Sequence, residues 1–221
     1  MAQLFPKAAT SIARAILVLI VAVPAALFGL QYAVARSSYV TRQNRYVDQL
    51  VPFSHQHHAG ELGIDCRYCH VSVEKTAYAG MPTTHVCMTC HSQLWTQAAM
   101  LAPVRESLVS GRPLHWNRVH RLPDYVYFNH SVHIAKGVSC AQCHGEVREM
   151  PLMRQAAPMT MQWCLSCHRN PGPYLGERSE VISADHKPMQ PMDEETARAH
   201  DYMRRYHVRP VGFDDCSVCH R

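Results

Sequence analysis

Apolar residues are concentrated in one long stretch near the N-terminus of the chain. Residues 15–30 read AILVLIVAVPAALFGL, and no charged residue occurs between Arg14 and Arg36. A helix over residues 15–35 is long enough to cross a hydrocarbon core of about 30 Å, so the pattern predicts a transmembrane anchor. Pro24 lies near the middle of the stretch, where we expect it to kink the helix.

A cleaved signal peptide is the alternative interpretation of this stretch. Lys7 and Arg14 form a basic region before the apolar run, and Ala33-Val34-Ala35 matches an A-x-A cleavage site. The run is longer than the apolar region of most signal peptides, which favours an anchor that is retained. The Lys and Arg residues on its two sides leave the orientation open.

Beyond the anchor, periodic patterns are short. Residues 92–109 have the pattern of an amphipathic helix, and a second helix is predicted from Asp193 through the sequence DEETARAHDYMRRYH. Residues 171–192 lack periodicity, so we expect a loop or arm there, with a disordered linker as the alternative. Strand patterns are almost absent. The prediction is a mainly α fold with much irregular structure.

Composition narrows the class of protein. Charged residues make up 18% of the chain and hydrophobic residues 47%, which excludes a disordered polyelectrolyte. Aromatic residues make up only 8%, too few for a conventional core, so we expect something other than side chains to fill the interior. The net charge is +5, but the basic residues are scattered, and we predict no nucleic-acid partner.

All ten cysteines belong to one repeated pattern, C-x-x-C-H, which occurs five times. The motifs are Cys66-Arg-Tyr-Cys69-His70 (motif 1), Cys87-Met-Thr-Cys90-His91 (motif 2), Cys140-Ala-Gln-Cys143-His144 (motif 3), Cys164-Leu-Ser-Cys167-His168 (motif 4) and Cys216-Ser-Val-Cys219-His220 (motif 5). In this spacing two thiols add to the haem vinyl groups as thioethers, and the next residue places its imidazole under the iron. The sequence therefore predicts five covalently bound haem c groups, haems 1 to 5.

Zinc sites and disulfides are the competing interpretations of the cysteines. A zinc ribbon needs two C-x-x-C pairs but no histidine after each, and five pairs cannot make whole four-cysteine sites. Chance placement of a histidine after all five pairs has odds of roughly two in a million. Haem attachment takes place outside the cytoplasm, so we expect residues 37–221 on the periplasmic side of the inner membrane.

A repeat surrounds the motifs. Their first cysteines, at 66, 87, 140, 164 and 216, are 21, 53, 24 and 52 residues apart, which pairs haems 1 and 2, pairs haems 3 and 4, and leaves haem 5 alone. The pattern F-x-H-x-x-H precedes motif 1 as FSHQHH and motif 3 as FNHSVH. Histidines three residues apart share a helix face and can reach two neighbouring irons. The predicted distal ligands are His55, His58, His130 and His133, whereas His57 aligns with Val132 and is not expected to bind iron.

The fifth distal ligand is left open. His120 and Met161 compete for it, with Met159, His85 and His207 as further candidates. A thioether ligand would raise the reduction potential of its haem, but the methionines near motif 4 also suit ordinary packing against a porphyrin. We interpret His115, His186 and His200 as surface residues.

The motifs and the apolar stretch divide the chain. The expected parts are a cytoplasmic N-terminus (1–14), the transmembrane anchor (15–35), a linker (36–52), a first haem-pair module (53–125), a second haem-pair module (126–170), and a C-terminal arm with haem 5 (171–221). Too few residues accompany each motif for a separate apolar core, so we expect a multihaem cytochrome c domain whose core is the haems.

The haem-pair modules look like the cytochrome c3/c7 class. The arrangement from Arg45 to Arg221 resembles the membrane-anchored pentahaem subunit of bacterial alternative complex III, on the segments FSHQHHAGELGIDCRYCH, MPTTHVCMTCH, WNRVHRLPDYVYFNHSVH, MTMQWCLSCHRNP and CSVCHR. The resemblance implies an electron-transfer subunit, not itself an enzyme, of a quinol-oxidising respiratory complex. It also implies an iron–sulfur protein and polytopic quinol-binding subunits as partners, a monohaem cytochrome c or terminal oxidase as acceptor, and mostly bis-histidine ligation with one methionine-ligated haem.

Two other functions compete with this one. A membrane quinol dehydrogenase of the NapC/NrfH type shares the anchor and the haems, but it usually has four haems and places the first against the membrane. A multihaem reductase needs one iron with an open face, commonly marked by C-x-x-C-K, and no lysine replaces any of the five motif histidines.

Overall fold

The computed structural model describes residues 6–182, 197–209 and 213–220. Contacts between Cα atoms divide the chain into two compact units, Met1–Arg42 and Gln43–Arg221. Each unit is considered by itself below.

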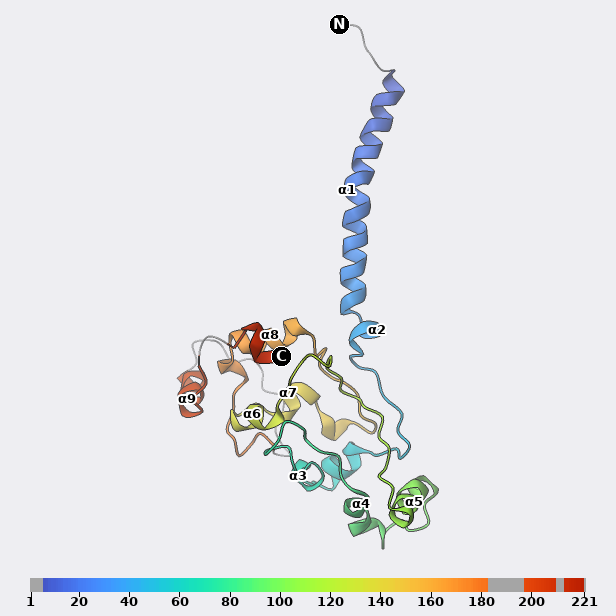
Figure 1. Cartoon of the computed structure of the whole chain (residues 1–221), viewed down its shortest axis with the longest axis vertical. Coiled ribbons are helices and arrows are strands. Elements are labelled where there is room, and N and C mark those ends of the chain that lie inside the picture. The colour runs from blue at the N-terminus through green and yellow to red at the C-terminus, as the bar shows by residue number, and fades with distance from the viewer. Residues whose placement is uncertain (1–5, 183–196, 210–212, 221) are drawn as a thin grey trace. The chain divides into compact units, whose positions relative to one another are not determined.

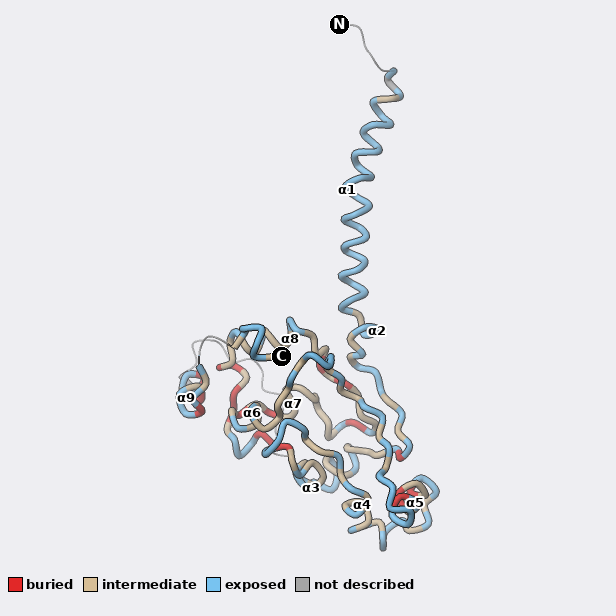
Figure 2. The backbone as a smooth tube through the Cα atoms, viewed as in Figure 1, coloured by how far each residue is buried: buried red, intermediate tan, exposed pale blue. Residues whose placement is uncertain are grey.

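The first unit is one long helix followed by a short one. Helix α1 (Lys7–Arg36) is continuous through Pro24, and α2 (Ser38–Thr41) follows it (Figure 1). Within the span Ala8–Thr41 an 18-residue stretch has a mean hydropathy of 2.4, and nearly all residues of the span are exposed (Figure 2). At its C-terminal end the guanidinium of Arg36 lies 4.3 Å from the ring centre of Tyr32, as expected at a membrane–water boundary. The helix is therefore long and apolar enough to cross a bilayer.

The second unit consists of short helices joined by irregular chain. They are η1 (Gln56–Glu61), α3 (Cys66–Cys69), α4 (Thr84–His91), η2 (Ala99–Leu101), α5 (Ala102–Ser110), α6 (His130–Ala135), α7 (Cys140–His144), η3 (Val147–Glu149), α8 (Met161–Arg169), η4 (Gly172–Tyr174), α9 (Ala197–Arg205) and α10 (Cys216–Cys219). Within the described ranges there are no β-strands, only three isolated bridges. A mainly helical fold is confirmed for the described part of the chain.

The helix predicted over residues 92–109 is wrong in its first half. Residues 92–98 form turns, and Trp95 has a left-handed φ of 57°. Helical structure starts at Ala99, Pro103 occupies the first turn of α5, and Gly111 ends it. The helix predicted from Asp193 is observed as α9, with residues 193–196 outside the described part of the chain. Residues 171–182 of the predicted arm contain η4 and turns. Residues 183–192 of the arm lie outside the described part of the chain.

Buried apolar side chains form no single core among the described residues, and two small clusters stand out. Val51, Leu101 and Val104 make the first, which also contacts Cys87 and Met88 of motif 2. The second is made by Leu175, Tyr202 and Tyr206. Figure 2 shows the buried positions as short separate segments. Side chains alone thus provide little interior, as the low aromatic content predicted.

Gly137, just after α6, allows the chain to pack closely on the segment that follows η4. Its φ is +83°, and an added Cβ would lie 2.5 Å from the carbonyl oxygen of Gly176. Gly111 also has a positive φ, +67°, but open space around it. We expect Gly111→Ala to cost about 1 kcal/mol from backbone strain alone, and Gly137→Ala about 2 kcal/mol more from the steric clash.

The thermal unfolding midpoints of the two full-length variants in detergent, compared with the unmodified chain, measure this difference. Equal midpoints for the two variants would contradict the close packing at Gly137.

Candidate functional site

Each C-x-x-C-H motif lies on a helical turn. Motifs 1, 3 and 5 begin a helix at their first cysteine, in α3, α7 and α10. Asp65 and Ser139 cap the first two of these, accepting hydrogen bonds from the backbone N–H of Arg67 (2.8 Å) and Ala141 (3.1 Å). Motifs 2 and 4 instead form the C-terminal turns of α4 and α8. In every case one turn of helix brings both thiols and the imidazole into one region.

The cysteines are all free of disulfides and mostly half-buried. Burial raises the pKa of Cys140 to about 11 and that of Cys143 to about 12, with neighbouring cysteines adding to the shift. These thiols are therefore neutral at physiological pH and lie close to cysteines of other motifs.

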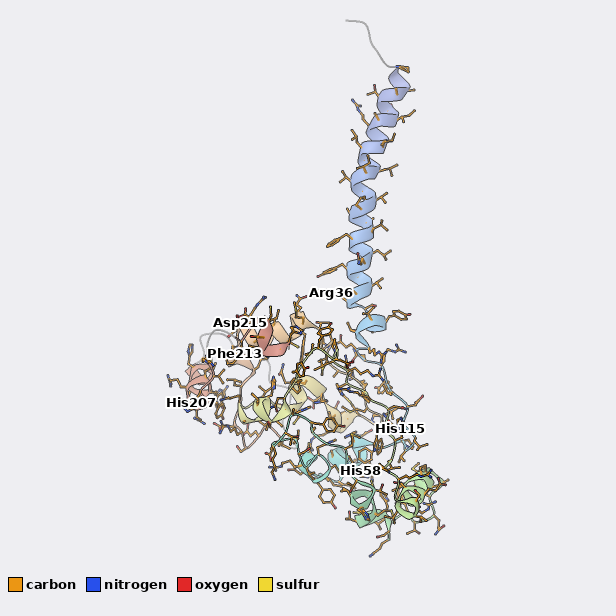
Figure 3. All side chains as sticks on the ribbon, viewed as in Figure 1. Arg36, His58, His115, His207, Phe213 and Asp215 are labelled. Carbon is orange, nitrogen blue, oxygen red and sulfur yellow. The ribbon has the colours of Figure 1, made fainter. Side chains whose placement is uncertain are left out.

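Four of the five motif histidines donate a hydrogen bond from Nδ1 to a backbone carbonyl. The acceptors are Gly80 for His70 (2.7 Å), Leu94 for His91 (3.2 Å), Phe213 for His168 (2.8 Å; Phe213 is labelled in Figure 3) and Tyr125 for His220 (3.2 Å). Such a bond fixes the tautomer and leaves Nε2 with a lone pair for a metal. Nδ1 of the fifth, His144, is buried without a partner among the described residues.

The two F-x-H-x-x-H repeats have the same local geometry. Each phenylalanine ring stands edge-on to the first histidine and stacks on the second. The ring-centre distances are 4.9 and 4.3 Å from Phe53 to His55 and His58, and 4.8 and 4.4 Å from Phe128 to His130 and His133. The second histidine of each donates from Nδ1 to the carbonyl four residues earlier, that of Ser54 or Asn129. This likeness holds although the first repeat winds as the π-helix η1 and the second as the α-helix α6.

Three distal–proximal pairs have the spacing of two imidazoles on one iron. An imidazole nitrogen binds a metal at about 2 Å and the ring centre lies about 1 Å further, so opposed ligands have ring centres about 6 Å apart. The observed distances are 6.2 Å for His58 and His91, 6.3 Å for His130 and His144, and 6.2 Å for His133 and His168. After burial, the neighbour that contributes most to the lowered pKa of His55 is His70, the histidine of motif 1. The residues present thus fit the cofactor that the motifs predict.

Burial favours the neutral form of three of the four predicted distal imidazoles. It lowers the pKa of His55 to about 4 and also lowers the pKa values of His58 and His133. The pKa of His144 is likewise lowered, chiefly by burial and then by His120. Because iron binds the neutral form, these side chains are in the protonation state of a ligand.

The two competitors for the fifth distal position lie in different places. The ring of His120 is 4.3 Å from that of His144, edge-on, with its Nε2 buried and unpartnered among the described residues. This is too close for opposed ligands of one iron, and it places His120 beside motif 3. Met161 is 68% exposed at the start of α8, one turn before Cys164. Met159 has a left-handed φ of 53°.

The remaining histidines lie at the surface where they are described. Nδ1 of His57 is 2.8 Å from a carboxylate oxygen of Glu61, and the exposed ones are His85, His115, His200 and His207 (His115 and His207 are labelled in Figure 3). His186 lies outside the described residues. The carbonyl acceptors of the ligand histidines were not predicted from the sequence. A backbone carbonyl has no residue-type signal, so no sequence pattern indicates it.

Comparison with known proteins shows a similarity over part of the chain. No family model matches the chain. Over 98 residues it is 36% identical to the multihaem cytochrome c subunit of a menaquinone reductase from Nitratidesulfovibrio vulgaris. The match covers 44% of this chain and 46% of that relative, so the chain spans about half the length of the protein it matches. The chain is therefore similar to a multihaem cytochrome c, in agreement with its motifs.

The haem count can be tested at the C-terminal motif. Replacing both thiols in Cys216→Ala/Cys219→Ala removes the two thioether bonds of haem 5 and leaves the other four motifs intact. We expect the covalent haem content per chain to fall by one fifth, measured by intact mass and by the absorbance of the alkaline pyridine derivative. The mass of covalently bound haem is the difference between the measured mass and the mass of the polypeptide alone. An equal difference for the variant and the unmodified protein would contradict attachment at motif 5.

Proposed function

We propose that the chain is a pentahaem c-type cytochrome that relays electrons within a quinol-oxidising membrane complex similar to alternative complex III. The observation that carries the proposal is the set of three histidine pairs whose ring centres are 6.2 to 6.3 Å apart beside C-x-x-C-H motifs. When bound, each haem c supplies an iron that takes up and gives off one electron.

The chain's own residues attach, orient and enclose these groups. The ten thiols would form the thioether bonds, and the motif histidines and their opposed partners would hold the irons. With side chains filling these positions, no position would remain for a substrate, so the chain conducts rather than catalyses. No side chain needs to act as an acid, base or nucleophile in this role.

The apolar helix α1 gives the complex a membrane anchor, with the haem domain on the periplasmic side. The similarity to a menaquinone reductase subunit supports a link to quinones. In this proposal an iron–sulfur protein and polytopic quinol-binding subunits are the neighbours that oxidise quinol. A monohaem cytochrome c or a terminal oxidase receives the electrons.

A quinol dehydrogenase of the NapC/NrfH type is the second candidate, because it also combines one span with periplasmic haems. Addition of a menaquinol analogue separates the two functions. We expect fast haem reduction in the complex purified in mild detergent and at least tenfold slower reduction of the isolated full-length chain, followed by haem absorbance. Equally fast reduction of the isolated chain would establish the quinol dehydrogenase instead.

The fifth distal ligand in this proposal is Met161. His120 lies against His144, whereas α8, which carries Met161, meets motif 5: the carbonyl of Phe213 accepts a hydrogen bond from His168, and Arg169 lies 3.4 Å from Asp214.

Removing the methionine side chain that binds iron would leave one iron with an open position for carbon monoxide. We expect reduced Met161→Ala to bind carbon monoxide at one haem per chain, while the unmodified protein and the control His120→Ala bind none. Difference spectra under carbon monoxide measure the stoichiometry. Binding in His120→Ala and not in Met161→Ala would reverse the assignment.

A further inference from the structure

The contacts between motifs do not follow their order in the chain. Motif 1 touches motif 2 through its middle residues: the hydroxyl groups of Tyr68 and Thr89 are 2.8 Å apart. These residues lie between the two cysteines of their respective motifs, so the two attachment turns face each other.

Motif 1 also touches motif 3, on its other side. Cys66 and Cys140, the first cysteines of the two motifs, line one cavity. Nδ1 and the backbone N–H of His130 both donate to the carbonyl of Ala77, in the segment that follows motif 1, at 2.8 and 3.3 Å. Arg148, just after motif 3, donates to the carbonyl of Ala59, just before motif 1, at 2.8 Å. The two modules therefore meet at their first motifs.

Motif 3 continues to motif 4, and motif 4 to motif 5. His130 and His133 lie on the single helix α6 and face His144 and His168, so the two iron positions are neighbours. His168 of motif 4 donates to the carbonyl of Phe213, three residues before motif 5.

These contacts together identify the neighbours of each motif. Four adjacent pairs of motifs result: 1 with 2, 1 with 3, 3 with 4, and 4 with 5.

Motif 2 meets the rest of the unit through few elements. His91 faces His58, Thr89 contacts Tyr68, and Cys87 packs against the cluster of Val51, Leu101 and Val104. All ten cysteines lie in the described residues, and the two that are exposed, Cys90 and Cys216, belong to motifs 2 and 5.

We infer that the five haem-attachment motifs form one row in the spatial order 2, 1, 3, 4, 5, so that electrons enter and leave the chain at motifs 2 and 5. The inference rests on the proposed electron relay. The two modules are joined through equivalent parts, first motif to first motif, which is the self-complementary contact of a two-fold pair. Motif 2, second in the sequence, is thereby an end of the row.

Reduction potentials test the order, because an electron placed on one iron lowers the potential of its neighbours and has less effect at greater distance. Single variants first label the haems: His55→Met, His58→Met and His130→Met should each raise the potential of one haem, those of motifs 1, 2 and 3. In His130→Met the motif 3 haem is reduced first. The reduction wave of the motif 1 haem, identified by His55→Met, should then shift to lower potential. The reduction wave of the motif 2 haem, identified by His58→Met, is the matched control and should stay in place.

The opposite pattern, with the wave of motif 2 shifted and that of motif 1 unchanged, would overturn the order and leave the relay intact. If none of the three variants moves a wave, the ligand assignment fails instead. If a variant does not assemble, iron anomalous scattering from the unmodified protein decides the order. The motif 1 iron should lie between those of motifs 2 and 3, and a motif 2 iron in that place would refute the row.

Discussion

The arrangement of this domain depends on a geometric demand of imidazole as a ligand. Nε2 must be free and unprotonated while Nδ1 is held, and here backbone carbonyls hold Nδ1 of most of the histidines concerned. The carbonyls come from other segments as often as from the same turn. The carbonyl of Phe213 accepts a hydrogen bond from His168, and that of Ala77 accepts one from His130. Each such bond joins two parts of the chain, so orienting the ligands also folds the domain.

This explains how a chain with so little apolar core can have a defined structure. The two clusters around Val104 and Leu175 are far too small to organise a unit of this length. The helices that carry the motifs are four to nine residues long, below the length at which helices are stable alone. Tertiary contacts must therefore stabilise them, and the ring pairs lie where porphyrins would supply those contacts.

The sequence predicts the chemistry better than the arrangement. The C-x-x-C-H motifs and the F-x-H-x-x-H repeat are local patterns, and the structure brings His58, His130 and His133 opposite motif histidines at the spacing of one iron. The position of His120 beside His144 depends on a segment with no periodic pattern, and sequence spacing from motif 5 gives no sign of it. Residues 92–98 have an amphipathic pattern but form turns, because the left-handed Trp95 interrupts the helix.

The spatial order of the motifs was also beyond the sequence, for a reason that duplication makes clear. A repeat fixes the geometry inside each module, and Phe53 and Phe128 show how closely the two copies agree. It does not fix which surfaces of the copies meet. Two identical units can stack head to tail, which would preserve the sequence order, or head to head, which reverses one of them. Cys66 and Cys140 on one cavity are equivalent residues, so the copies meet head to head. The second motif of the first copy is then farther from motif 3 than the first motif is, at the opposite end of the row from the C-terminal arm.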